Sequence, residues 1–199
     1  MELIFATNNR HKVEEIQSAI GDKIKIRTLS EAGIDIDIPE PYDTLEANAL
    51  QKARTIFQLS GIDCFSEDTG LEVESLNGQP GVKSARYAGD EKDFEKNIGK
   101  LLSELANSDN RNARFRTVIS LIWSGKEYFF DGVCTGTILH GARGTNGFGY
   151  DSVFVPTGAE NTFAEMDMKQ KNQYSHRRKA ADKLVSFLQN IASTRLKFE

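Results

Sequence analysis

Apolar and polar positions in the opening part of the chain alternate between the spacing of strands and that of helices. Residues 3–6 form a short apolar run, which predicts a buried strand. Apolar residues then recur at Val13, Ile16 and Ile20, a helical spacing that a glycine ends. Alternation through residues 23–29 predicts a second strand. This succession of strand, helix and strand favours a mixed α/β fold.

Two more helices are expected before the middle of the chain. Residues 44–60 have helical spacing, with Asp43 and Glu46 at the separation of a capping box. The apolar face of this helix comprises Leu45, Ala49, Ala53, Ile56 and Phe57. Residues 93–106 are also amphipathic, which predicts a further surface helix.

The second half of the chain begins with strand-like segments. Residues 114–123 and 127–139 flank a short turn, so we expect an antiparallel hairpin. A glycine-rich segment, residues 141–149, follows the hairpin. A final helix is expected to begin near Ser175 and to bury its apolar residues Ala181, Leu184, Val185, Leu188 and Ile191.

Two adjacent carboxylates, Glu67 and Asp68, occupy the strand-like segment at the centre of this pattern. Neighbouring side chains in an extended segment point to opposite faces, so we expect different roles for the two. One would aim at a metal ion or a water molecule, and the other would support it. A strand that simply ends in solvated acids is the structural alternative.

Length and charge limit the classes of protein to consider. The 199 residues fit a single domain spanning residues 1–199, with or without two lobes. A net charge of −4 does not favour a nucleic-acid polymer as partner. Without a membrane-spanning apolar run or a signal peptide, we expect a cytoplasmic protein with no membrane attachment. The cysteines, Cys64 and Cys134, lack metal-ligand spacing and are expected to be buried free thiols.

Basic residues open two of the predicted helices, at residues 10–12 and 176–179. The amino-terminal end of a helix carries a partial positive charge, so cations there are unfavourable unless an anion lies beside them. Two such helix ends indicate a polyphosphate ligand. The alternative is that these long side chains extend into water.

Acidic residues form a complementary set that includes Glu40 and Asp68. Carboxylates combined with substrate phosphates are the usual ligands of Mg²⁺. The three histidines lack the paired spacing of a zinc site. The chain also lacks the glycine-rich P-loop sequence.

Seven motifs match one known family, in the same order along the chain. They span residues 6–12, 48–53, 66–71, 78–87, 147–151, 162–166 and 171–177. On these motifs the chain resembles the inosine triphosphate pyrophosphatase (HAM1-like) family. The resemblance implies an elongated mixed α/β protein with two lobes around a central cleft, assembled as a homodimer. It also implies hydrolysis of inosine, deoxyinosine and xanthosine triphosphates to the monophosphate and pyrophosphate.

The resemblance further assigns roles to individual residues. Glu40 and Asp68 are expected to hold Mg²⁺, and Asp68 is also expected to accept the proton. In the resulting mechanism, Lys12, Lys52 and Lys171 stabilise the oxygens that gain charge in the transition state. The implied substrate contacts are Thr7, Asn8, Asn9, Arg10, His11, Lys12, Thr69, Phe148, Gly149, Tyr150, Asp151, Lys171, His176 and Arg177. Within this set, Phe148 would stack on the base, and His176 and Arg177 would pair with its O6 atom.

Two other functions fit the same residues. One is a Maf-like nucleotide pyrophosphatase, which would act on pyrimidine or modified triphosphates. The other is a nucleotide- or RNA-binding module without turnover, which would never release pyrophosphate.

Overall fold

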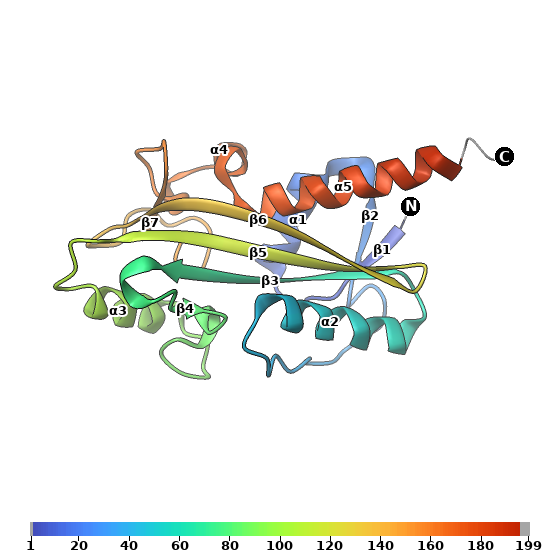
Figure 1. The fold of residues 1–199 in the computed structure, drawn as a ribbon, viewed down its shortest axis with the longest axis horizontal. Helices are drawn as coiled ribbons and strands as arrows, with labels where there is room; N and C mark the ends of the chain where they lie inside the picture. Colours follow the sequence, from blue (N-terminus) through green and yellow to red (C-terminus); the bar gives the residue numbers. More distant parts are fainter. Residues whose placement is uncertain (1, 196–199) are drawn as a thin grey trace. The chain divides into compact units, whose positions relative to one another are not determined.

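The computed structural model describes residues 2–195 as a mixed α/β fold. Its helices and strands, in chain order, are β1 (Glu2–Phe5), α1 (Arg10–Ile20), β2 (Lys25–Thr28), α2 (Leu45–Ser60), β3 (Cys64–Val73), β4 (Pro80–Gly81), α3 (Phe94–Glu104), β5 (Asn112–Trp123), β6 (Lys126–Ile138), β7 (Phe154–Pro156), α4 (Met168–Tyr174) and α5 (His176–Arg195) (Figure 1). The strands pair in the order β2-β1-β3-β5-β6-β7, and β4 pairs with β3. β1 runs parallel to β2 and β3, whereas β4 and β7 are antiparallel to their partners. The predicted fold class is therefore confirmed.

Helix caps decide where the first helices begin and end. The side chain of Asn9 accepts a hydrogen bond from the backbone of Lys12 at the start of α1. At α2 the cap is Thr44, whose hydroxyl accepts from the N–H of Ala47. The predicted capping box on Asp43 is therefore wrong by one residue. A threonine hydroxyl directly before the first helical residue satisfies one of the free N–H groups of the first turn.

The predicted hairpin corresponds to β5 and β6, which pair along their length. Ser124 and Gly125 join them, with φ angles of 50° and 73°. Two residues with positive φ make the tight turn whose twist matches that of an antiparallel pair.

Within residues 2–195, no helix combines the length and apolar character needed to cross a bilayer.

The chain divides into two compact units. The first unit comprises Met1–Asp68, Val118–Gly132 and Arg177–Glu199, and the second unit comprises Thr69–Thr117 and Val133–His176. Strands β3, β5 and β6 contribute residues to both.

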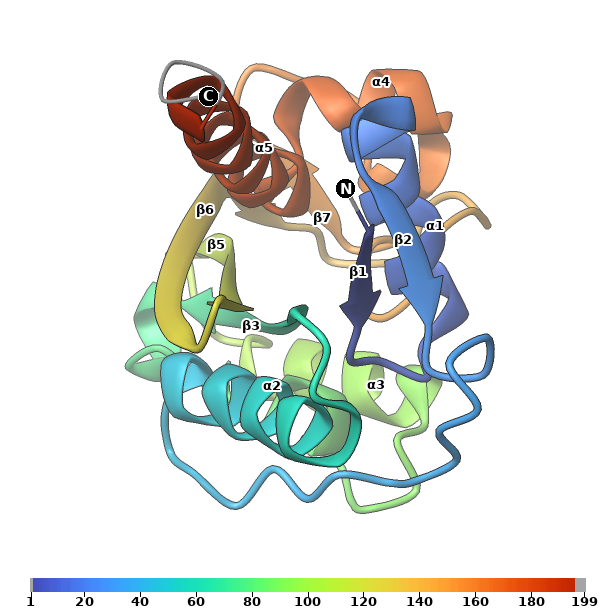
Figure 2. The same cartoon turned by 90° about the vertical axis from the view of Figure 1, so that its right-hand side faces the viewer.

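The first unit has three layers. Helices α1 and α5 cover one face of its strands, and α2 covers the other (Figure 2). Successive side chains of β1 point to opposite faces of the sheet, so the strand contributes to the apolar core on each face. Leu3 and Phe5 pack under α1 and α5, whereas Ile4 packs under α2. The buried thiol of Cys64 belongs to the α2 side, as expected for a free cysteine.

The second unit has its own apolar core. Leu101 and Leu105 at the carboxyl end of α3 pack with residues of β3, β5 and β6. Phe115 on β5 meets Phe154 edge-on, with ring centroids 4.7 Å apart, and stacks on Phe163 at 6.0 Å. Three apolar clusters, two in the first unit and one in the second, therefore hold the segments that carry the predicted site residues.

A glycine in the second unit provides a test of the packing of β3. A side-chain carbon added at Gly70 would lie 2.6 Å from the backbone oxygen of Gly81 on β4. We therefore expect Gly70→Ala to destabilise the protein by about 1–3 kcal/mol, because two backbones would have to separate. Urea unfolding measures the change. Gly99→Ala, at an open position of α3, is the matched control and should stabilise by about 0.5–1 kcal/mol. Equal effects of the two substitutions would contradict this account.

Candidate active site

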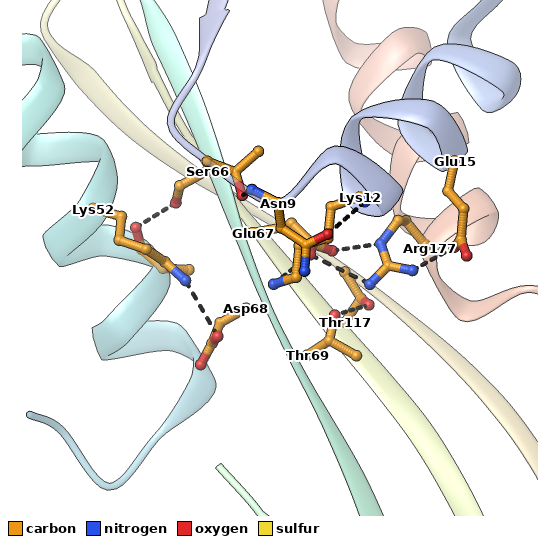
Figure 3. Close-up of polar contacts among 12 residues, drawn as sticks. Asn9, Lys12, Glu15, Lys52, Ser66, Glu67, Asp68, Thr69, Thr117 and Arg177 are labelled. Atoms are coloured by element: carbon orange, nitrogen blue, oxygen red, sulfur yellow. Dashed lines mark hydrogen bonds and ion pairs between the residues drawn. The ribbon is translucent and has the colours of Figure 1, made fainter. Parts of the chain in front are cut away.

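The adjacent carboxylates of β3 are both buried. Glu67 is 1% exposed and Asp68 is 7% exposed, so the alternative of a solvated strand end is wrong. The two side chains also contact different cations, as expected for neighbours that point to opposite faces of a strand, and their different roles stay a prediction. Asp68 meets Lys52 from α2, whereas Glu67 meets Lys12 from α1 and Arg177 from α5 (Figure 3).

Asp68, Lys52 and Glu40 form one cluster in the first unit. The ammonium group of Lys52 lies 3.2 Å from Asp68 Oδ1 and also donates a hydrogen bond to Glu40. Burial disfavours the charged amine, but Asp68 and Glu40 outweigh that effect and raise the pKa of Lys52. Burial also raises the pKa of Asp68, against the opposing effect of Lys52 and Lys12. Asp68 is thus a stronger base than an ordinary aspartate.

Glu40 and Asp68 also fit the expected magnesium ligands. The ammonium of Lys52 contacts an oxygen of each, so a single point between the two carboxylates already favours a cation. Among residues 2–195, no group of three or more histidine, cysteine or acidic side chains is arranged to hold a metal ion. A pair of carboxylates suits Mg²⁺, which commonly takes one or two carboxylates and completes its shell with substrate phosphates and water, and the magnesium site stays a prediction.

A second cluster surrounds Glu67. Its Oε1 lies 2.7 Å from the ammonium of Lys12, and its Oε2 accepts a hydrogen bond of 2.8 Å from Nε of Arg177. Arg177 also donates to Glu15 on α1. Burial alone would raise the pKa of Glu67, but Arg177 and Lys12 outweigh it and hold that pKa well below its usual range. Glu67 is therefore a permanent anion.

These contacts correct part of the interpretation of the basic helix starts. For Lys12 and Arg177, the anion at the amino-terminal ends of α1 and α5 is a carboxylate of the protein itself. Arg178 likewise pairs with Asp182 at 2.9 Å on the same helix, and His11 lies 3.7 Å from Glu14. Phosphate is therefore not needed to explain why cations are tolerated at these positions.

The loop before α1 is held by its own side chains. Thr7 accepts a hydrogen bond from the N–H of Asn9, and Asn8 donates to the carbonyl of Ile36. Arg10 and His11 are exposed. The structure thus supports a tight turn in this segment, and its contact with phosphate stays a prediction.

Asp151 and Lys171 form a buried pair in the second unit. Their charged atoms are 2.7 Å apart, and their side chains are 6% and 5% exposed. Asp151 also accepts the N–H of Phe148, and a side-chain carbon at Gly147 would lie 2.1 Å from its Oδ2. The Lys171 ammonium lies 5.6 Å from the centroid of the half-buried Phe148 ring. The glycine-rich segment therefore folds around Asp151, with Gly149 in its turn at a φ of 61°.

Three predicted contacts are placed where their side chains have structural partners. Tyr150 is buried and donates to the carbonyl of Ser84, and its contact with substrate stays a prediction. His176 is 2% exposed and stacks on Phe115 with ring centroids 4.7 Å apart. Arg177 is also 2% exposed, and contact with a base would require its guanidinium to leave the carboxylates. Pairing of His176 and Arg177 with O6 stays a prediction.

Thr69 is a half-buried member of the predicted contact set. Its hydroxyl lies 2.5 Å from that of Thr117, and both residues belong to the second unit. Its contact with substrate also stays a prediction.

Glu15 is the site residue that sequence reasoning missed. Helical spacing places it on the same face as Ala19, four residues further on, which is buried. A lone carboxylate on an apolar helix face is a signal that a cation lies opposite, because buried acids are nearly always paired.

Comparisons with known proteins give relatives for nearly the whole chain. The model of the Ham1 family matches residues 3–187. The "dITP/XTP pyrophosphatase" of Flavobacterium psychrophilum is 49% identical over 190 residues, covering 96% of this chain and 100% of the relative. The protein of the same description from Porphyromonas gingivalis is 50% identical over 188 residues, covering 94% and 97%. A solved structure of a HAM1 protein from Coxiella burnetii matches with a TM-score of 0.86 at 35% identity, covering 96% of this chain and 99% of that one.

The pair in the second unit generates a stability prediction. Asp151→Asn removes the charge but keeps an acceptor for the N–H of Phe148. We expect a loss of about 3–5 kcal/mol in the free energy of unfolding, because the Lys171 ammonium would stay buried without its counter-charge. Denaturant unfolding measures it, and the double substitution Asp151→Asn with Lys171→Met should recover much of the loss. No recovery in the double variant would contradict the ion-pair explanation.

Proposed function

Because the chain belongs to the Ham1 family, we propose that it hydrolyses non-canonical purine nucleoside triphosphates, dITP, XTP and ITP, to the monophosphate and pyrophosphate. Relatives that it matches over nearly their whole length are named dITP/XTP pyrophosphatases. The observation that carries the proposal is the cluster in which Lys52 joins Glu40 to Asp68. The Maf-like alternative lacks support from the comparisons.

Asp68 is the proposed proton acceptor. A water molecule attacks the α-phosphorus, and its proton passes to Asp68. The bond between the α-phosphorus and the oxygen that bridges to the β-phosphate then breaks, and pyrophosphate leaves with the electron pair. Without a bound metal, burial raises the pKa of the Asp68 carboxyl above its ordinary value.

Lys12 and Lys52 are the proposed electrostatic groups. Each ammonium is anchored by a carboxylate, which fixes its position before a phosphate oxygen arrives. Donors that are already in place stabilise the charge that develops in the transition state. Magnesium, held by Glu40 and Asp68 together with the triphosphate, would supply neutralisation of phosphate charge. A homodimer and a cytoplasmic location stay predictions.

The first test is pyrophosphate release across a panel of triphosphates. We expect kcat/KM for ITP, dITP and XTP to exceed the values for ATP, GTP, CTP and UTP. A chelator should abolish release, and added Mg²⁺ should restore it. A preference for pyrimidine triphosphates would favour the Maf-like alternative. Nucleotide binding without any pyrophosphate would favour a binding module.

The second test replaces the proposed proton acceptor. Asp68→Asn should lower kcat by about 10²–10⁴-fold, because the amide cannot take the proton. Nucleotide binding, measured by titration calorimetry, should persist in part. Asp182→Asn, an acid-to-amide change at the half-buried pair with Arg178, should leave kcat unchanged. Turnover close to that of the wild type in Asp68→Asn would remove Asp68 from the mechanism.

A further inference from the structure

Glu67 is a buried carboxylate to which the proposed reaction assigns no step. It is 1% exposed, and two cations converge on it from different helices. Lys12 is the third residue of α1, and Arg177 is the second residue of α5. A carboxylate beside two helix starts is favoured by both helix dipoles as well as by both side-chain cations.

The two carboxylate oxygens of Glu67 contact different sets of cationic groups. Oε1 lies 2.7 Å from the Lys12 ammonium and accepts a longer bond of 3.3 Å from Nη2 of Arg177. Oε2 accepts from Nε of Arg177 at 2.8 Å. An amide at this position would offer one oxygen and one donor group, so one of the two cations would face a donor instead of an acceptor.

Arg177 fixes Glu67 in turn. Its guanidinium is bonded to Glu15 as well as to Glu67, and both acids are almost fully buried. Two acids and two cations give the group of Glu15, Arg177, Glu67 and Lys12 no net charge. Lys12 has the most exposed side chain of the four, at 17%, so it is the member able to meet a ligand.

We propose that Glu67 is a positioning residue that acts through Lys12. Its Oε1 sets where the Lys12 ammonium stands, and the guanidinium of Arg177 keeps that oxygen in place. The role rests on the proposed function, because the position of Lys12 affects turnover only if Lys12 meets phosphate oxygens. Since those oxygens gain charge in the transition state, a displaced ammonium lowers kcat more than it changes KM.

The test is a double-mutant cycle of Glu67→Gln and Lys12→Met, read as kcat and KM for ITP with Mg²⁺. In the wild-type background, Glu67→Gln should lower kcat by about 10²-fold, the loss that a misplacement of about 1 Å produces. In the Lys12→Met background the same change should lower kcat by less than about 3-fold, because residues that act through one another are not additive. Glu127→Gln is the control, since this acid pairs with Arg54 on α2 and should leave kcat unchanged.

Equal fold-losses in the two backgrounds would overturn the proposal, because a purely structural role of Glu67 would not depend on Lys12. Rates are divided by the folded fraction from circular dichroism. If Glu67→Gln unfolds, Glu67→Asp keeps the charge and shortens the reach, and the same cycle applies to it. Absence of pyrophosphate release by the wild type would refute the proposed function instead. Nucleotide affinity, measured for the wild type, the two single variants and the double variant, would then test whether Glu67 acts through Lys12.

Discussion

A guanidinium held between two buried carboxylates links three elements of the first unit. Arg177 of α5 bonds to Glu67 of β3 and to Glu15 of α1. Any one of these ions alone in the interior would cost several kcal/mol, so each is stable only because the others are present. The packing of the two helices against β3 and the charge state of Glu67 therefore depend on each other. Both in turn set the surroundings of Lys12.

Hydrophobic periodicity was sufficient for most of the fold. The spacing of apolar residues predicted α1, α2, α3 and α5, and the hairpin of β5 and β6 followed from two strand-like runs and a turn. Helix α4 was missed because its seven residues, Met168–Tyr174, are mostly polar and span only two turns. The first residue of α2 was also misplaced by one position. Asp43 and Thr44 are both residue types that cap helices well, and the backbone conformation determines which of them is the cap.

The candidate site was predictable where a residue type is tied to a local motif. Asp68, Lys52 and Glu40 were all expected, and the structure brings them together. The burial of Arg177 was not expected, although it continues the stripe of Ala180, Ala181 and Leu184 at helical spacing. Its partner Glu67 lies 110 residues away in the sequence, so the residues around Arg177 do not predict the ion pair. Charged residues on an apolar stripe were therefore assigned to a ligand instead of to each other.

The placement of α5 has a consequence for how the protein is made. This helix leaves the ribosome after every other described element, yet it carries the guanidinium that neutralises Glu15 and Glu67 and covers the apolar faces of Ile119 and Leu121. A nascent chain that lacks it holds two carboxylates that cannot be withdrawn from water. The first unit therefore completes its core only once α5 has been synthesised, and until then part of its apolar surface stays exposed.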